Sequence, residues 1–416
     1  MKVKDVICAE GRSGYMHRDL LAIKSGKAKP NGSLYEGAPM SPGFTRIIEP
    51  ATIISMMLVL EDGQIAFGDC ADVILAGVAG RDPAFNAKHH MDYVRTEVAD
   101  ALRGRDVSRF RENAEEMDRF SRGGKRLHTA IRYGVSQALL HATALSRKET
   151  MAEVIAREYG SAISTEPIPI LASCHKDDAG QLDRVILKRV GLLPHGSFQI
   201  VSEHIGLQGE KLASFVRGVA ARIKEIGDPD YSPRIHVDLY GTLGELFEMK
   251  VESIAEYLGR LRKESGAYQL LVESPMIAKT QEEQIEKFSG LRKRLREQGT
   301  DVGIIADEWC NTLPDIKLFS EAEASDFVQI KTPDLGSIHN TIEAVLYCKA
   351  DGMGACLGGT ANETDHSTRI STHMGLACQP DFMLSKPGLG ADEALMIQTN
   401  EMARTLAILQ ARRRSA

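Results

Sequence analysis

Four segments of the sequence decide the fold, and they read RIHVD (234–238), QLLVE (269–273), VGIIAD (302–307) and FVQIK (327–331). Each is a short apolar run that ends in a charged residue, and helical patterns such as residues 243–265 and 280–298 separate them. Short apolar runs of this length are typical of buried strands. Strands that alternate with amphipathic helices predict parallel βα units.

The same alternation extends in both directions along the chain. Two apolar runs precede the four, at residues 168–173 and 190–195, and two weaker runs follow, at residues 354–358 and 381–384. Eight such units predict an α/β fold in which residues 166–416 form a (β/α)8-type, TIM-like barrel.

The first 165 residues have a different pattern. Strand-like runs at residues 3–9 and 52–60 come first, and a turn at residues 61–64 leads into a further short strand. Helical periodicity then follows at residues 85–103 and 126–159. This mixture predicts a separate N-terminal α+β domain over residues 1–165.

Composition excludes several classes of protein. The chain has 416 residues, of which 43% are hydrophobic, so it can bury a large core without disulfides. It carries 51 basic and 57 acidic residues, and this net charge of -6 argues against a nucleic-acid partner. The longest apolar run, residues 53–60, is too short to span a bilayer, so no membrane partner is expected. Seven cysteines without a C-x-x-C pair indicate free thiols in a reducing cytoplasm.

The strand ends supply the candidate metal ligands. The carboxyl ends of barrel strands share one site, and three consecutive strands end in Asp238, Glu273 and Asp307, spaced 35 and 34 residues apart. A single acid at a strand end is often only the cap of the next helix. Three in register are harder to explain as caps, and carboxylate oxygens are the ligands that Mg²⁺ prefers. The pattern therefore favours a Mg²⁺ site.

Two further strand ends supply a candidate base and acid. Lys331 ends the next strand, and a divalent cation beside it would lower the pKa of its amine and favour a neutral base. His195 ends the second strand, on the opposite side of the barrel. A base and an acid that flank a metal-held carboxylate can remove the proton next to that carboxylate, and Mg²⁺ stabilises the resulting enediolate.

Longer stretches around these residues resemble the methylaspartate ammonia-lyase family of the enolase superfamily. In the barrel they are LPH (193–195), HVDLYGT (236–242), VESP (272–275), ADEWCNT (306–312), QIKTPDLG (329–336) and GGTANET (358–364). The likeness continues through LEDGQ (60–64) and FGDC (67–70), so it covers nearly the whole chain.

This resemblance implies a reaction and its residues. The family reversibly eliminates ammonia from 3-methylaspartate to give mesaconate, with Mg²⁺ and no organic cofactor; a monovalent cation such as K⁺ is left open. Asp238, Glu273 and Asp307 would bind the metal. Lys331 would take the C3 proton of the L-threo substrate, while His195 would serve the opposite face and the erythro isomer.

The resemblance also implies substrate contacts and a setting for the enzyme. Gln329 and Thr360 match substrate-binding positions, and residues 1–165 would be the capping domain of an enolase-superfamily architecture. A homodimer in the cytoplasm would be expected, acting in amino-acid degradation through glutamate fermentation.

The chain departs from the family pattern at three positions. The family has Gln where this chain has Ser173 and Ile74, and Cys where this chain has Ala361. These positions line the substrate's amine and its far carboxylate, so Ser173 and Ala361 join the candidate substrate contacts. The metal and acid–base residues are intact, whereas the substrate could be a related 3-substituted aspartate.

Two alternatives stay open at this point. The first is another enzyme of the superfamily, a racemase, epimerase or dehydratase acting on a different carboxylate. The second is a binding protein that has kept the barrel and lost turnover. The presence of all three carboxylates, Lys331 and His195 favours the lyase over the binding protein.

Overall fold

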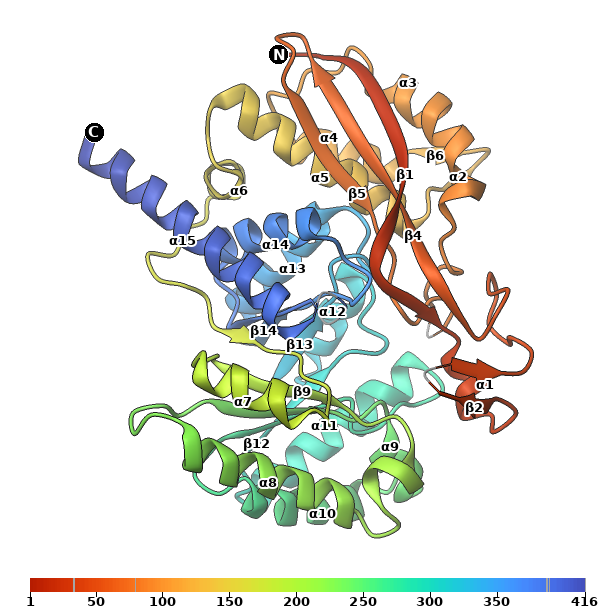
Figure 1. The fold of residues 1–416 in the computed structure, drawn as a ribbon, viewed down its shortest axis with the longest axis vertical. Helices are drawn as coiled ribbons and strands as arrows, with labels where there is room; N and C mark the ends of the chain where they lie inside the picture. The colour runs from red at the N-terminus through yellow and green to blue at the C-terminus, as the bar shows by residue number, and fades with distance from the viewer. Residues whose placement is uncertain (33, 79, 387, 389, 416) are drawn as a thin grey trace.

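A three-stranded antiparallel sheet runs along the N-terminal part of the molecule (Figure 1). The computed structural model describes residues 1–32, 34–78, 80–386, 388 and 390–415. The strands lie in the order β1 (Val3–Arg18), β4 (Ile48–Leu60) and β5 (Ile65–Cys70). The turn between β4 and β5 falls at residues 61–64, as the sequence predicts.

One helix lies directly against this sheet. A Cβ atom on Gly68 of β5 would be 2.1 Å from the carbonyl oxygen of Gly134, and one on Gly134 would be 2.4 Å from Sγ of Cys70. Only glycine permits so close an approach of helix to strand. The helix is α5 (Thr129–Arg147), and further helical segments of this domain are α2 (Ala87–Tyr93), a π-helical turn (Val94–Val98), α3 (Ala99–Leu102), α4 (Phe110–Arg119) and α6 (Met151–Tyr159).

Three elements of this domain differ from their predicted extents. β1 runs well past residue 9, through a register shift between Arg12 and Met16. The predicted helix at residues 85–103 contains the π-helical turn. The predicted helix at residues 126–159 is two helices, because Lys148 has a left-handed backbone with φ of 57° and Thr150 forms a capping box that starts α6.

The rest of the chain forms the predicted closed barrel of eight parallel strands. Each strand coincides with one of the eight apolar runs, and all their neighbour pairs are parallel. The strands are β8 (Ile170–Leu171), β9 (Leu192–Ser197), β10 (Arg234–Asp238), β11 (Leu270–Glu273), β12 (Val302–Ala306), β13 (Phe327–Ile330), β14 (Gly354–Leu357) and β15 (Phe382–Leu384).

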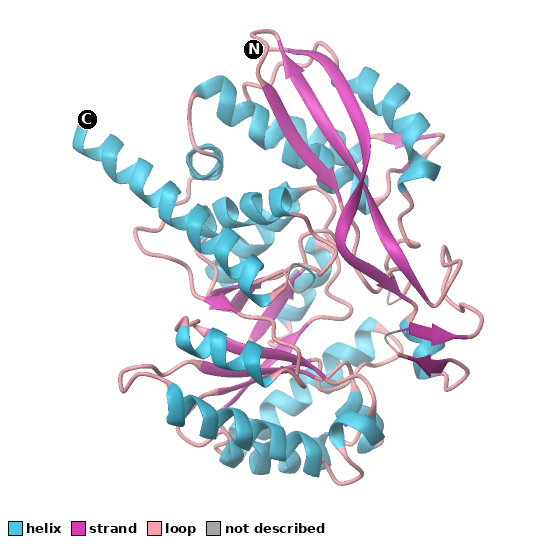
Figure 2. Ribbon diagram, in the orientation of Figure 1, coloured by secondary structure: helices cyan, strands magenta, loops and turns pink. Residues whose placement is uncertain are grey.

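Helices surround these strands (Figure 2). They are α7 (Ala179–Leu187), α8 (Glu210–Ile226), α9 (Thr242–Leu246), α10 (Val251–Glu264), α11 (Gln281–Glu297), α12 (Leu313–Glu321), α13 (Ile338–Asp351), α14 (Asp365–Cys378) and α15 (Ala391–Ser415), with a π-helical turn at Val201–Ile205. The barrel interior is packed by buried side chains that include Leu271, Ile305 and Phe382. No helix among the described residues is long and apolar enough to cross a membrane.

The N-terminal domain docks on the carboxyl ends of the barrel strands. Thr364, which follows β14, donates to Asp69 of β5 at 2.5 Å, and the nearby His366 ring lies 2.8 Å from the Phe67 carbonyl oxygen. Lys24 of α1 (Leu20–Lys24) donates to the carbonyl of Tyr240, beyond β10, at 2.8 Å. The remaining strands of this domain are two small hairpins, β2 (Lys29–Asn31) with β3 (Leu34–Glu36) and β6 (Ser121–Arg122) with β7 (Lys125–Arg126).

Candidate active site

A small cavity of about 50 Å³ lies between the strand ends and the N-terminal domain, and we call it the inner cavity. Seven of the predicted site residues stand at or near it because their strands all open toward it. The barrel contributes His195, Asp238, Tyr240, Glu273, Gln329, Lys331, Gly359, Thr360, Ala361 and Leu384, and the N-terminal domain contributes Val73, Ile74, Leu75 and Arg81. Asp307, a further predicted site residue, is buried and contacts Lys331.

The three carboxylates predicted to bind metal are buried, with exposures of 3% for Asp238, 1% for Glu273 and 3% for Asp307. Burial, followed by the repulsion of Glu273, raises the pKa of Asp238 well above its usual value. Burial and then Asp307 do the same to the pKa of Glu273. Oδ1 of Asp307 has no hydrogen-bond partner among the described residues. Concentrated buried negative charge with an unsatisfied oxygen fits a divalent cation.

Lys331 forms an ion pair with Asp307, and this pair acts on the pKa of the lysine. The lowered pKa expected from the sequence applies to a site with a bound cation and stays a prediction. Burial acts to lower the pKa of Lys331, but Asp307, and to a lesser extent Glu308, outweigh burial and raise it above its usual value. The predicted lowering assumed a cation that takes up the negative charge of Asp307. Without one, the carboxylate stabilises the ammonium form of Lys331.

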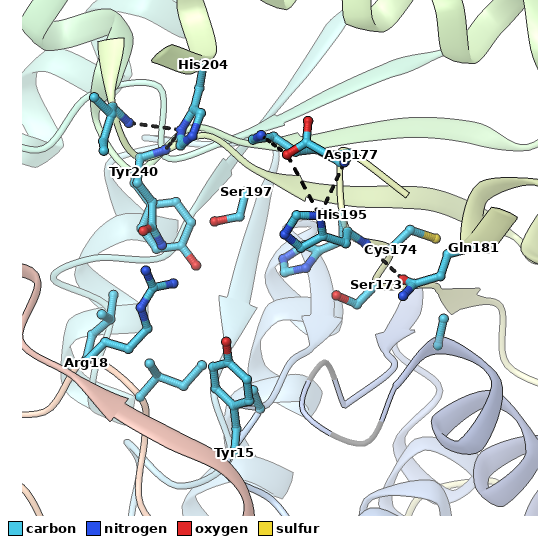
Figure 3. Close-up of a pocket in the computed structure, with 18 of the residues that line it drawn as sticks. Tyr15, Arg18, Ser173, Cys174, Asp177, Gln181, His195, Ser197, His204 and Tyr240 are labelled. Carbon is cyan, nitrogen blue, oxygen red and sulfur yellow. Dashed lines mark hydrogen bonds and ion pairs between the residues drawn. The ribbon is translucent and has the colours of Figure 1, made fainter. Parts of the chain in front are cut away.

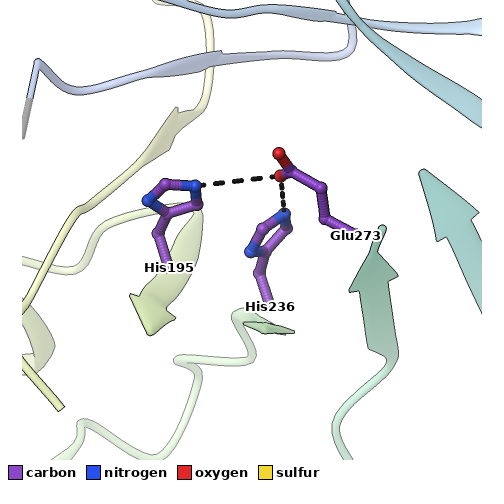
Figure 4. Close-up of side chains that lie close together, drawn as sticks. All are labelled: His195, His236 and Glu273. Atoms are coloured by element: carbon purple, nitrogen blue, oxygen red, sulfur yellow. Dashed lines mark ion pairs between the residues drawn. The ribbon is translucent and has the colours of Figure 1, made fainter. Parts of the chain in front are cut away.

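A second set of potential ligands stands beside the carboxylates. Ligand atoms of His195, His236 and Glu273 all lie within 4.8 Å of one another (Figure 4). Nε2 of His195 is 3.8 Å from Oε2 of Glu273, and Nε2 of His236 is 3.0 Å from that same oxygen. Imidazole nitrogens suit transition metals such as zinc better than Mg²⁺. Glu273 belongs to both sets of potential ligands. The set of three carboxylates suits Mg²⁺ better than the set with two histidines.

His195 is held as a neutral ring. Burial, followed by the repulsion of His236, lowers its pKa well below the usual value. His195 has a left-handed backbone conformation, with φ of 48°, in the middle of β9. Nε2 also lies 3.9 Å from Oδ2 of Asp238, so the ring stands against two of the proposed metal ligands.

Gln329 and Thr360, the predicted substrate contacts, both line the inner cavity. The Gln329 amide donates to both carboxylate oxygens of Glu273, at 3.2 and 3.3 Å, and its own Oε1 has no hydrogen-bond partner among the described residues. Thr360 accepts from the backbone N–H of Ile74 at 3.2 Å. A Cβ atom on Gly358 would lie 2.2 Å from Oε1 of Gln329. Any larger residue at position 358 would therefore clash with this oxygen.

Ser173, Ile74 and Ala361, where the chain departs from the family pattern, lie together in space. All three line a larger hollow of about 470 Å³, which we call the outer chamber, and Ile74 and Ala361 also line the inner cavity (Figure 3). Ser173 faces the outer chamber and is absent from the inner lining.

Sequence reasoning missed two residues of the inner site. His236 sits two residues before Asp238 on the same strand, so the alternation of side chains along a strand could have identified it. Arg81 comes from a loop of the N-terminal domain, where spacing gives no signal. Its buried side chain binds Asp334 through Nε at 2.8 Å and reaches within 3.9 Å of Asp307, and neither terminal nitrogen has a hydrogen-bond partner among the described residues.

A buried network behind the site was also missed. Lys386 and Glu363, both completely buried, form an ion pair at 2.8 Å. Glu363 also accepts from the hydroxyl of Tyr133 in α5 and, at 3.1 Å each, from Thr332 and the N–H of Thr360. The network thus joins the N-terminal domain to the loop that carries Thr360.

The chain matches family models over nearly its full length. Residues 1–160 match the model described as "Methylaspartate ammonia-lyase N-terminus", and residues 162–411 match "Methylaspartate ammonia-lyase C-terminus". Among curated relatives, Methylaspartate ammonia-lyase 2 of Carboxydothermus hydrogenoformans is 47% identical, with 99% of each chain covered. Methylaspartate ammonia-lyase of Clostridium tetanomorphum is 43% identical, over 99% of this chain and 100% of the relative.

Solved structures agree with these matches. The Mg-complex of beta-methylaspartase from Clostridium tetanomorphum superposes with a TM-score of 0.92 at 43% identity, covering 99% of this chain and 100% of that one. The Citrobacter amalonaticus methylaspartate ammonia lyase containing (2S,3S)-3-methylaspartic acid gives a TM-score of 0.96 at 43% identity, with the same coverage. A muconate lactonizing enzyme from Pseudomonas fluorescens, at 13% identity and a TM-score of 0.63, shares the fold.

Proposed function

The chain belongs to the methylaspartate ammonia-lyase family, and we propose that it removes ammonia from 3-methylaspartate, leaving mesaconate, with the residues that surround the inner cavity. The main support for this proposal is the geometry of one buried site. The predicted base, acid and metal ligands meet there, although they come from five different strands. Full-length relatives at 43–47% identity support this reaction over that of a racemase, epimerase or dehydratase. The retained base and acid argue against a binding protein without turnover.

We propose Lys331 as the base for the L-threo isomer. It takes the proton from C3, the C3–H electrons form the C2–C3 double bond, and the C2–N bond breaks with its electrons leaving on ammonia. Lys331 must be neutral to accept the proton. Asp307, the ion-pair partner of Lys331, is also a proposed metal ligand. A bound metal would take up part of the negative charge of Asp307, so Asp307 would stabilise the ammonium form of Lys331 less.

His195 serves the opposite face of the substrate. Its ring is neutral and stands within 4 Å of Asp238 and Glu273, so it can accept the C3 proton of the erythro isomer. Burial of the site excludes water from these proton transfers.

Asp238, Glu273 and Asp307 would hold the divalent metal, which we propose to be Mg²⁺. When bound, it would neutralise the charge that develops on the substrate's carboxylate as C3 loses its proton. The hard oxygen donors and the unsatisfied oxygen of Asp307 support this choice.

The remaining proposed substrate contacts are Gln329, Thr360, Ala361 and Ser173. The free Oε1 of Gln329 is placed to accept from the substrate's ammonium group. Thr360 and Ala361 line the inner cavity, and Ser173 lines the adjoining outer chamber.

We further propose that the two parts of the chain, residues 1–165 and 166–416, act as a capping domain and a catalytic barrel. The hydrogen bonds from Thr364 and His366 to β5 support this division of labour. The homodimer, the cytoplasmic location and the metabolic role stay predictions.

Ultraviolet absorbance of the conjugated diacid tests the reaction. Purified protein with L-threo-3-methylaspartate and Mg²⁺ should show growing absorbance, and EDTA should abolish that growth. Folded protein that binds Mg²⁺ but forms no mesaconate would contradict the proposal.

A further inference from the structure

The outer chamber is larger than the proposed reaction needs. It holds about 470 Å³ against about 50 Å³ for the inner cavity, and the two hollows share Ile74, Leu75, His195, Tyr240 and Ala361 in their walls. Besides a carboxylate and a hydrogen on each carbon, 3-methylaspartate carries a methyl group on C3 and an ammonium group on C2. Neither group would fill a hollow of this size.

Three of the five residues that both hollows share have small or apolar side chains, namely Ile74, Leu75 and Ala361. Ile74 and Ala361 border both hollows, and Ser173 lies just beyond, on the outer side. The chain therefore leaves room for a substituent that passes from the inner cavity into the outer chamber.

Arg18 is a cation of the outer chamber whose Nε has no hydrogen-bond partner among the described residues. It ends β1, and Figure 3 shows its guanidinium pointing toward Tyr240 on the barrel side. Nε of Arg18 is buried without a hydrogen-bond partner, and among the described residues no carboxylate forms an ion pair with this side chain. Buried polar nitrogens are normally satisfied, so a missing acceptor is implied.

The other charged groups of the chamber are already matched. Asp177 forms an ion pair with Lys176 and lies 3.9 Å from the His175 ring. Glu203 lies 3.9 Å from the ring of His204. These carboxylates have basic neighbours, whereas Arg18 has no acidic one among the described residues.

The backbone fixes the point from which Arg18 projects. Its N–H donates to the Ile74 carbonyl at 3.1 Å, and the next N–H, of Asp19, donates to Ile47 at 2.8 Å. The Asp19 carboxylate in turn accepts from Ser41 and Ala22. Arg18 is thus attached to the same segment, around Ile74, that separates the inner cavity from the outer chamber.

We propose that the outer chamber receives a substituent of a larger aspartate, carried on C3 or on the leaving amine, and that Arg18 binds an anionic group at its end. This inference rests on the proposed elimination reaction and specifies its substrate class. A planar guanidinium suits a carboxylate because it can donate two parallel hydrogen bonds. Tyr15, Tyr240 and Ser197, which point into the chamber in Figure 3, offer hydroxyl groups to the same ligand.

The test compares anionic with neutral substituents of equal length. For C3, kcat/KM is measured for 3-(2-carboxyethyl)aspartate and for 3-butylaspartate. For the amine, the reverse reaction is measured, with mesaconate and either β-alanine or butylamine. The wild-type protein should prefer the anionic member of at least one pair by about tenfold or more, and the pair that shows the preference identifies the attachment point.

Arg18→Gln should remove that preference, measured as the ratio of the two kcat/KM values. Arg46→Gln is the matched control, because Arg46 is an exposed arginine of the same domain outside the chamber, and it should keep the ratio. If Arg18→Gln does not fold, the wild-type ratios still decide the proposal. Turnover of 3-methylaspartate with no preference in either pair would overturn the inference and leave the lyase assignment intact. Absence of turnover with every substrate would instead contradict the proposed function and this inference with it.

Discussion

At the scale of single residues, Asp307 links the proposed base to the proposed metal site. It forms an ion pair with Lys331, lies 3.9 Å from Arg81 and keeps one oxygen without a hydrogen bond among the described residues. Its position between a proposed base and a proposed metal makes it the residue through which metal binding acts on Lys331.

Asp307→Asn should therefore weaken Mg²⁺ binding by about tenfold or more, because it removes one anionic ligand. Isothermal titration calorimetry with Mg²⁺ measures the change. The matched control is Asp301→Asn, an exposed carboxylate outside the site, which should bind Mg²⁺ as the wild-type protein does. Equal Mg²⁺ affinity in the two variants would argue against the carboxylate triad.

The sequence could indicate which residues lie together where those residues end a strand. Asp238, Glu273 and Lys331 follow buried apolar runs, and the geometry of a barrel brings such positions together whatever the details of packing. Arg81 and Arg18 lie in the other domain, and their approach to the site depends on how that domain docks. Spacing along one chain contains no information on such contacts.

At the scale of elements, the buried pair of Glu363 and Lys386 links the loop after β14 to the loop after β15. Lys386 also donates to the carbonyl of Gly358, at 3.0 Å. Gly358 lies against Gln329, and Thr360 lines the inner cavity. The ion pair of Glu363 and Lys386 therefore sets the position of one wall of the site.

Lys386→Met should destabilise the fold by about 3–5 kcal/mol, because it leaves the Glu363 carboxylate buried without its cation. Urea unfolding followed by circular dichroism measures the loss. Adding Glu363→Gln to the first change should restore part of the stability, since the unpaired charge is then gone. A Lys386→Met protein as stable as the wild type would refute this role. Arg109→Met, which breaks an exposed ion pair with Glu112, is the control and should change little.

Element boundaries were harder to predict than the elements themselves. All eight barrel strands were found from their apolar runs, although β8 has only two residues in the ladder. The break at Lys148 was missed because neither glycine nor proline marks it, and a left-handed lysine costs little enough for the following capping box to offset it. The length of β1 depends on its pairing with β4, which is a long-range contact.

At the scale of the whole molecule, partly buried histidines make stability depend on pH. Burial, then repulsion from His366, lowers the pKa of His141 to about 4, and burial, then His128, lowers the pKa of His90 to about 4. Both values lie below the ordinary histidine value of about 6.5. Between the two values the unfolded chain binds more protons, so acid favours unfolding.

The free energy of unfolding should therefore be highest above about pH 6.5 and fall as the pH drops toward 4. Each of these histidines contributes at most about 1.4 kcal/mol per pH unit. Urea midpoints at several pH values measure this slope. His141→Gln should lose part of it, whereas His89→Gln, at an exposed position, should not. An identical slope in both variants would contradict this explanation.

The sequence predicted the architecture of each part of the chain, but it did not predict how the two parts pack against each other. The two-part organisation and the barrel follow from local periodicity. The placement of the N-terminal sheet over the strand ends, and with it the outer chamber, depends on contacts such as that between Thr364 and Asp69, which are 295 residues apart in the sequence.

The most direct test of the central claim is hydrogen exchange at C3, followed by proton NMR in D₂O with Mg²⁺ present. The wild-type protein should remove the C3 proton of both the L-threo and erythro isomers of 3-methylaspartate. Lys331→Ala should lose this activity with the threo isomer while His195 still supports it with the erythro isomer. Threo exchange at the wild-type rate in Lys331→Ala would contradict the assignment of Lys331 as the base and the account built on it.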